Sequence, residues 1–210
     1  MSQYDEEPGY SSYELNETVN LEPPGAGLPN FERAFLNMGL RFFSFVKSGE
    51  NALKLFKSET LELRRLANHE EGLAAEQVVI PRMMGIEDSS RNWSVLMVIQ
   101  HLRQTNSEML TCIKALRSGQ TPRGKIDIAD YKPDPDIGFG VIESYRDESI
   151  AYEVEIEGLL EQHGSLKSSQ KFQHPWFGPM NAHQWHCLCA LHQRIHRKQA
   201  QKIYAVLGIA

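Results

Sequence analysis

Apolar residues recur at helical spacing through most of the chain after residue 30. The first such segment begins FERAFLNMGLRFFSF, and its apolar series consists of Phe35, Met38, Phe42, Phe45, Leu53, Phe56, Leu63 and Ala67. Ser48 and Gly49 interrupt this series, and Asn30 is a candidate cap at its start. The pattern therefore predicts one long broken helix, or two helices in succession, ending near Asn68.

Three more segments show the same helical spacing. They cover residues 92–116, 138–163 and 181–207. Ser89 or Ser90 is a candidate cap for the first of these helices. The clearest apolar seam of the second consists of Ile142, Tyr145, Ser149, Tyr152, Ile156 and Leu159. Each segment is long enough to form one wall of a helical bundle.

The connecting segments are richer in turn-forming residues. Residues 70–90 form a connector around Pro81, with a short helix expected over 74–79, while 119–138 and 164–180 are expected to be loops. Convincing alternating strands and internal repeats are not found in the sequence. The predicted fold is therefore all-α, an antiparallel four-helix bundle that occupies residues 31–210.

The first thirty residues differ in composition from the rest. They hold six acidic residues and no Lys or Arg, whereas the remainder holds 22 basic and 21 acidic residues. We expect residues 1–30 to form an extended or mobile acidic arm. The net charge of −5 therefore comes from the arm, and the nearly neutral bundle lacks the basic balance of a nucleic-acid binder.

Composition also indicates in which cellular compartment the protein is expected. The chain has no apolar run of eighteen residues, and its first twenty residues lack the basic and apolar regions of a secretory signal. Its three cysteines are too few and odd in number for a disulfide framework, so we expect a cytoplasmic protein. Cys187 and Cys189 would lie about 160° apart on a helix, which excludes a mutual disulfide.

The stretch WHCLCALHQRIHRKQ carries the most suggestive chemistry. His192 and His196 are four residues apart, so they lie on one face of the last helix. That face is the apolar stripe, shared with Trp185, Leu188, Ile195, Gln199, Ile203 and Val206. Two inward imidazoles one turn apart can present two metal ligands, or each can be a hydrogen-bonded core residue. The helix alone leaves both interpretations open.

A third ligand would have to come from another helix. His101 is the candidate, and it lies on the shoulder of its helix, beside the apolar stripe rather than within it. Periodicity alone does not select this residue. His69, His163, His174, His183 and His186 are weaker candidates by position.

Two motifs resemble those of a known family. SSRNWSVLMVIQHL and HPWFGPMNAHQWHCLCALHQRIHRKQ are similar to sequences of the DinB/YfiT-like superfamily, whose subgroups carry an HP-x-FG-x-M…W…H-x-x-x-H signature. The resemblance implies a four-helix bundle that binds a divalent metal through one histidine of the second helix and a pair on the last. It places the metal ligands at His101, His192 and His196.

The resemblance also implies a function. Three imidazoles leave positions open for water or substrate, and they suit zinc, nickel, copper or iron without selecting among them. Superfamily members include thiol-cofactor transferases and isomerases, with a low-molecular-weight thiol as cofactor, and others described as metal-dependent hydrolases. The expected function is therefore a metal-dependent enzyme of thiol-transferase or hydrolase type that acts on a small molecule. The alternatives are a non-catalytic metal-binding or stress-response protein, and a helical interaction module whose histidines merely pack.

Several further residues are candidates for the site. Glu108 lies one heptad beyond His101, and Glu148 and Glu155 lie beside the apolar seam of the helix predicted over 138–163. Each of the three is either an acid/base group or a solvated acid. Tyr145 and Tyr152 could line the cavity or pack in the core. Since the superfamily contains dimers, a homodimer is also expected.

Overall fold

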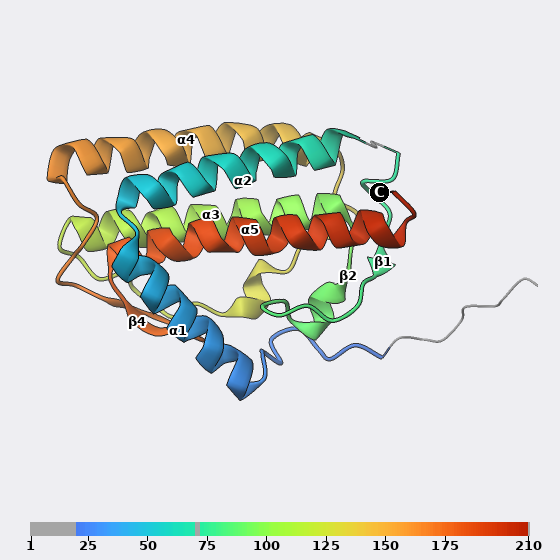
Figure 1. Cartoon of the computed structure of the whole chain (residues 1–210), viewed down its shortest axis with the longest axis horizontal. Coiled ribbons are helices and arrows are strands. Elements are labelled where there is room, and N and C mark those ends of the chain that lie inside the picture. The colour runs from blue at the N-terminus through green and yellow to red at the C-terminus, as the bar shows by residue number, and fades with distance from the viewer. Residues whose placement is uncertain (1–19, 70–71, 210) are drawn as a thin grey trace, which may run out of the picture.

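The computed structural model describes residues 20–69 and 72–209, and most of its described residues are helical (Figure 1). Its α-helices are α1 (Asn30–Val46), α2 (Gly49–His69), α3 (Val95–Arg117), α4 (Gly140–His163) and α5 (Ala182–Val206). The predicted pair of successive helices after residue 30 is confirmed as α1 and α2. Residues 1–19, most of the predicted acidic arm, lie outside the described residues.

Helices α2 to α5 form the predicted four-helix bundle, with α2 and α4 in one layer and α3 and α5 in the other (Figure 1). The bundle is antiparallel between α2 and α4 and between α3 and α5. The other neighbours run in the same direction, because the connection over residues 118–139 returns along the bundle before α4 begins. Ion pairs from α3 to α4 follow this parallel course, from Arg103–Glu148 to Lys114–Glu155.

Side-chain caps fix where two of these helices begin. The Ser94 hydroxyl accepts the Met97 N–H at 3.2 Å, and the Asn181 side chain accepts the Gln184 N–H at 3.0 Å. The predicted caps of α3, Ser89 and Ser90, lie instead in a short 3₁₀ turn, Asp88–Arg91. Asn30 is the first residue of α1, and no side chain caps that helix.

Within residues 20–69 and 72–209, four short strands lie in the connections. The helix expected over 74–79 is wrong, since β1 (Val78–Val79) pairs antiparallel with β2 (Asn92–Trp93). The 164–180 loop contains a hairpin of β3 (Phe172–His174) and β4 (Gly178–Met180). Strands of two or three residues are too short to show alternation in the sequence. The 119–138 loop holds only a 3₁₀ turn, Ile128–Tyr131.

The bundle core contains the predicted stripe of α2. Leu53, Phe56, Leu63 and Ala67 are all buried. Tyr152 of α4 stacks on Phe56 with ring centroids 4.3 Å apart, so the α4 seam faces the same core. None of the described helices combines the length and the apolarity needed to cross a membrane.

The apolar series of α1 does not face the bundle. Phe35, Met38, Phe42 and Phe45 are all more than half exposed, and the buried positions of α1 include Leu40. Helix α1 packs on the outside of the bundle, chiefly against α5 (Figure 1). A helix with one covered face can turn either face inward when the polar groups on that face find partners. The sequence pattern therefore located the two faces but not their directions.

Candidate metal centre

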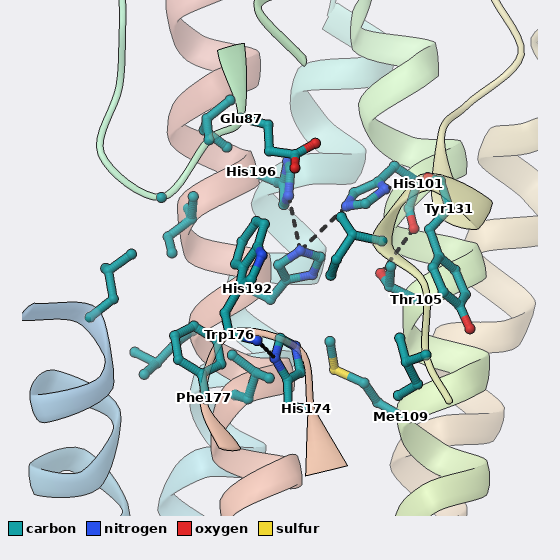
Figure 2. A pocket seen from close by; sticks show the side chains of 18 of the residues that line it. Glu87, His101, Thr105, Met109, Tyr131, His174, Trp176, Phe177, His192 and His196 are labelled. Carbon is teal, nitrogen blue, oxygen red and sulfur yellow. Dashed lines mark hydrogen bonds between the residues drawn. The ribbon is translucent and has the colours of Figure 1, made fainter. Parts of the chain in front are cut away.

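Helix α5 is buried on two faces rather than one. The face toward the bundle core carries His186 and Gln193, which are fully buried, although the sequence placed His186 off the inward stripe. His192 and His196 lie on the other face, which the β3–β4 hairpin, the 80–91 loop, the 118–139 connection and α1 cover (Figure 2). His192 and His196 therefore face a second, smaller interior, whereas Trp185, Leu188 and Ile203 of the same stripe belong to the hydrophobic core. The predicted inward orientation of the stripe agrees with the burial of most of its residues, and the core-facing side is buried as well because its polar residues are hydrogen-bonded to α3 and α4.

Three histidines converge in this second interior. His192 Nε2 lies 3.0 Å from His196 Nε2 and 3.4 Å from His101 Nε2. Their ligand atoms all lie within 4.8 Å of one another, and this is the one such group among the described residues that could hold a metal ion. Tetrahedral zinc with bonds of about 2.0–2.1 Å would separate two nitrogens by about 3.3 Å. The spacing therefore fits a shared ion.

Hydrogen bonds on the far side of two rings fix how those rings point. His101 Nδ1 lies 2.7 Å from the Tyr131 carbonyl oxygen, and His196 Nδ1 lies 2.6 Å from Gln199 Oε1. Since a carbonyl oxygen only accepts, each Nδ1 must carry the proton and donate it. Gln199 Nε2 in turn donates to the Ser90 carbonyl at 2.7 Å. The Nε2 atoms of His101 and His196 are therefore unprotonated, and each directs its lone pair at the centre of the group.

Burial keeps these rings neutral. It lowers the pKa of His101 to about 4, and it is the largest cause that lowers the pKa of His192 and His196 well below the ordinary value. Neutral imidazole is the form that binds metals. Two lone pairs converge on His192 Nε2, which can donate one proton at most, so a cation between the rings would relieve the remaining repulsion.

Aromatic and ionic groups surround the histidines. Trp93 is buried and stacks on His196 with ring centroids 6.1 Å apart. The Lys132 ammonium lies over the Trp93 ring and pairs with Glu87 at 2.6 Å. Glu87 also accepts backbone N–H groups from Gly25 and Gly27. The described end of the predicted arm therefore binds a carboxylate beside the candidate site.

An apolar cavity of about 130 Å³ opens beside the three histidines (Figure 2). Its apolar lining includes Leu40, Met109, Ile126, Phe177, Leu188 and Ile195. Glu108 and Tyr131 contribute polar groups, and burial raises the pKa of Tyr131 to about 12, so its hydroxyl stays protonated. Lys132 also lines the cavity, but it is already paired with Glu87. The cavity is comparable in size to an engineered one of about 150 Å³ that binds benzene.

His174 is a fourth histidine of the cavity wall, which its position in a loop gave little reason to expect. Its Nδ1 accepts the backbone N–H of Trp176 at 3.0 Å, and its ring stacks on Phe177. Because Nδ1 accepts, the proton must sit on Nε2. Burial lowers the pKa of His174 to about 3, so the ring is neutral. His174 is not a member of the group that could hold a metal.

The candidate acids separate clearly in the structure. Glu108 lines the cavity, whereas Glu148 and Glu155 form surface ion pairs with Arg103 and Lys114. The structure thus distinguishes one acid of the site from two solvated ones.

The two candidate tyrosines belong to the bundle core. The Tyr145 hydroxyl donates to Gln193 Oε1 at 2.5 Å, and the Tyr152 hydroxyl lies 2.8 Å from His186 Nδ1. Both are fully buried core residues with satisfied hydroxyls.

The remaining buried histidines and the cysteines have structural partners. His183 and His186 hydrogen-bond backbone carbonyls at the junction of α1 and α2. Cys112, Cys187 and Cys189 are free and buried, and burial raises the pKa of each thiol to about 12. Cys189 Sγ lies 3.3 Å from Asn106 Oδ1 and outside the three-histidine group. These cysteines are therefore neither thiolates at neutral pH nor members of that group.

Comparison with known proteins adds little. No protein-family model matches the chain, and no curated protein matches it either. Among solved structures, the crystal structure of TT2238, described as a four-helix bundle protein, aligns with 73% of this chain and 98% of its own, at 19% identity and a TM-score of 0.49. A likeness at this level says nothing about shared function, and the fold described above rests on the helices of this chain.

Proposed function

We propose that this chain is a DinB/YfiT-like protein whose bundle, residues 31–210, binds a divalent metal through His101, His192 and His196 and acts on a small molecule. One observation carries the proposal: three Nε2 atoms converge. Hydrogen bonds at Nδ1 of His101 and His196 leave the Nε2 atoms of these two rings unprotonated, with lone pairs free to bind a metal. Three neutral ligands suit zinc, nickel, copper or iron. The free, buried cysteines agree with a cytoplasmic setting.

The cavity beside the histidines supports an enzyme rather than a storage site. An ion with open coordination positions supplies a Lewis acid and can activate a nucleophile. The apolar wall would hold an uncharged, apolar part of a substrate, about the size of a benzene ring, and exclude water around it. A carboxylated low-molecular-weight thiol fits less well, because Lys132 is already paired with Glu87. We therefore favour a hydrolase acting on an apolar substrate.

Glu108 is the residue we assign to proton transfer. Of the three candidate acids it alone lines the cavity, and its charge is one of the causes that raise the pKa of Tyr131 beside it. A carboxylate in an apolar cavity can accept a proton from a nucleophile and return it to a leaving group. His174 would donate its Nε2 proton to a hydrogen-bond acceptor of the substrate, since its Nδ1 is held by Trp176.

Elemental analysis of protein purified without a histidine tag tests the metal site. We expect about one divalent metal per chain, lost in His192→Ala and retained in His163→Ala, because His163 lies exposed at the end of α4. Equal metal content in the two variants would refute the assignment of the ligands. Less than stoichiometric metal in the unaltered protein would favour histidines that merely pack.

Turnover separates the enzyme from a non-catalytic metal-binding protein. Short-chain 4-nitrophenyl esters are suitable probes, because their acyl and aryl groups are apolar. Glu108→Gln should lower kcat at least about a hundredfold while the metal is retained, whereas Glu148→Gln and Glu155→Gln should leave kcat unchanged. Bound metal without turnover of esters or in thiol-transfer assays would favour the non-catalytic alternative.

A further inference from the structure

Helix α1 exposes a continuous apolar stripe. It consists of Phe31, Phe35, Met38, Phe42, Phe45 and Val46, whose side chains are between 49% and 86% exposed. On a helical wheel the six lie within an arc of about 100°. From Phe31 to Phe45 their spacing alternates between four and three residues, which is the a/d pattern of a coiled-coil seam. Four of these residues, Phe35, Met38, Phe42 and Phe45, belong to the apolar series that marks this helix in the sequence.

The charged residues of α1 all turn away from the stripe. Glu32 is buried and pairs with Arg82 at 2.6 Å, and Arg41 donates to the Phe177 carbonyl. Arg33 donates to the Asn30 side chain. Throughout α1, which lies entirely in the described part of the chain, the exposed stripe carries no charge. A helix that binds a membrane surface would instead carry Lys and Arg along its polar border.

The area of the stripe suits a stable protein interface. From the exposed fractions, and about 150–250 Å² for a large aromatic side chain, the stripe offers roughly 700–800 Å² of apolar surface. The largest patch of a typical monomer is about 300–600 Å². A standard interface buries about 800 Å² on each partner. The stripe is therefore as large as one half of a standard interface.

We propose that a second copy of this chain covers the stripe, with the two α1 helices packed antiparallel across a twofold axis near Met38. In this arrangement Phe31 lies opposite Phe45 of the other copy, and Phe35 opposite Phe42, so one apolar row serves both partners. Ala34 and Gly39 flank the row, and a Cβ built on Gly39 meets no atom within 4 Å. The two backbones can therefore approach closely.

The dimer would also brace the candidate site. Leu36 and Leu40, on the other side of α1, line the apolar cavity. Figure 1 shows that α1 lies outside the four-helix bundle, so the rest of the chain supports it from one side only. A second α1 would hold this wall of the cavity in place. The inference is independent of the proposed metal chemistry, because it concerns the opposite face of α1.

Sedimentation equilibrium of the full chain tests the proposal. We expect a mass of twice 23.9 kDa. The double variant Phe35→Glu/Phe42→Glu should dissociate at least about a hundredfold more readily, because it places unpaired charges in the interface. Ile150→Glu/Val154→Glu is the matched control, since these α4 residues are 50% and 61% exposed but lie outside the stripe. The control should remain a dimer, and circular dichroism should be unchanged in both variants.

Cysteine crosslinking tests the geometry without introducing charge. The native cysteines are buried, so the background should be low. Met38→Cys should form a disulfide-linked dimer on oxidation. Phe31→Cys and Phe45→Cys should crosslink when mixed but not when each is alone, whereas a parallel pair would give the reverse.

Three results would overturn the proposal. The first is a chain that stays monomeric at all concentrations, including one that binds vesicles of anionic lipid through α1. The second is a dimer that survives Phe35→Glu/Phe42→Glu, which would place the interface on another surface. The third is self-crosslinking of Phe45→Cys in the absence of the Phe31→Cys variant, which would exclude the antiparallel arrangement.

Discussion

Gln199 determines which nitrogen of His196 is free to bind. Its side chain is fully buried between the His196 Nδ1–H and the Ser90 carbonyl, so it joins α5 to the loop that covers the site. Hydrogen-bond partners behind a ligand histidine fix the ring and its tautomer. The sequence could place Gln199 on the same face of α5 as the histidines, but its partner Ser90 is more than a hundred residues away.

Replacing Gln199 should therefore weaken metal binding without removing a ligand. We expect Gln199→Leu to lower metal affinity about 10–100-fold. Gln199→Glu should restore much of the affinity, since it keeps an acceptor for the His196 N–H. Gln201→Leu, on the exposed face of α5, is the control. Competition with a fluorescent zinc chelator measures the affinity, and equal values for the two leucine variants would contradict this role.

At the scale of elements, the segment before α1 depends on glycine. Gly27 has φ +85° and donates its N–H to Glu87 at 2.9 Å, which ties the segment to the loop beside the candidate site. A side chain at such a φ is strained. Gly158 is different, because it lies within α4 and a Cβ built on it meets nothing within 4 Å.

Alanine should therefore have opposite effects at these two glycines. Gly27→Ala should lower the free energy of unfolding by about 1–3 kcal/mol through backbone strain. Gly158→Ala should raise it by roughly 0.5–1 kcal/mol, because alanine favours helix and restricts the unfolded chain. Urea denaturation measures both changes. An unchanged or higher free energy of unfolding in Gly27→Ala would show that the conformation at Gly27 is not required.

At the scale of the whole molecule, buried histidines make the fold sensitive to acid. Burial lowers the pKa of His101, His174, His183, His186, His192 and His196. The unfolded chain, whose histidines titrate near 6.5, takes up protons before the folded chain does. Stability should therefore be complete above about pH 6.5 and fall as the pH drops toward the folded pKa values.

His186 allows this expectation to be measured away from the metal site. Its pKa is lowered to about 4, so its protonation in the unfolded chain should cost about 3 kcal/mol of stability by pH 4. We expect His186→Gln to reduce the slope of unfolding free energy against pH by about one proton near pH 5. Urea denaturation in the presence of a chelator measures the slopes. Identical slopes for His186→Gln and the unaltered protein would rule out a buried neutral His186.

The sequence by itself determined the helices and the ligand candidates. Helical periodicity depends on neighbours three and four residues away, so it located the five α-helices of the described part of the chain to within a few residues. The same local rule put His192 and His196 on one face. His101 was selected through a resemblance of motifs rather than through periodicity.

Only the tertiary structure decided which way each face points. Phe35 and Phe42 look like core residues yet are exposed, while His186 and Gln193 lie in the bundle core because α4 and other elements supply their hydrogen bonds. His174 and Glu87 reach the site through loops whose course has no periodic signal. The physical reason is the same in each case: a pattern along one chain records how apolar a surface is, whereas what covers that surface depends on residues far away in the sequence.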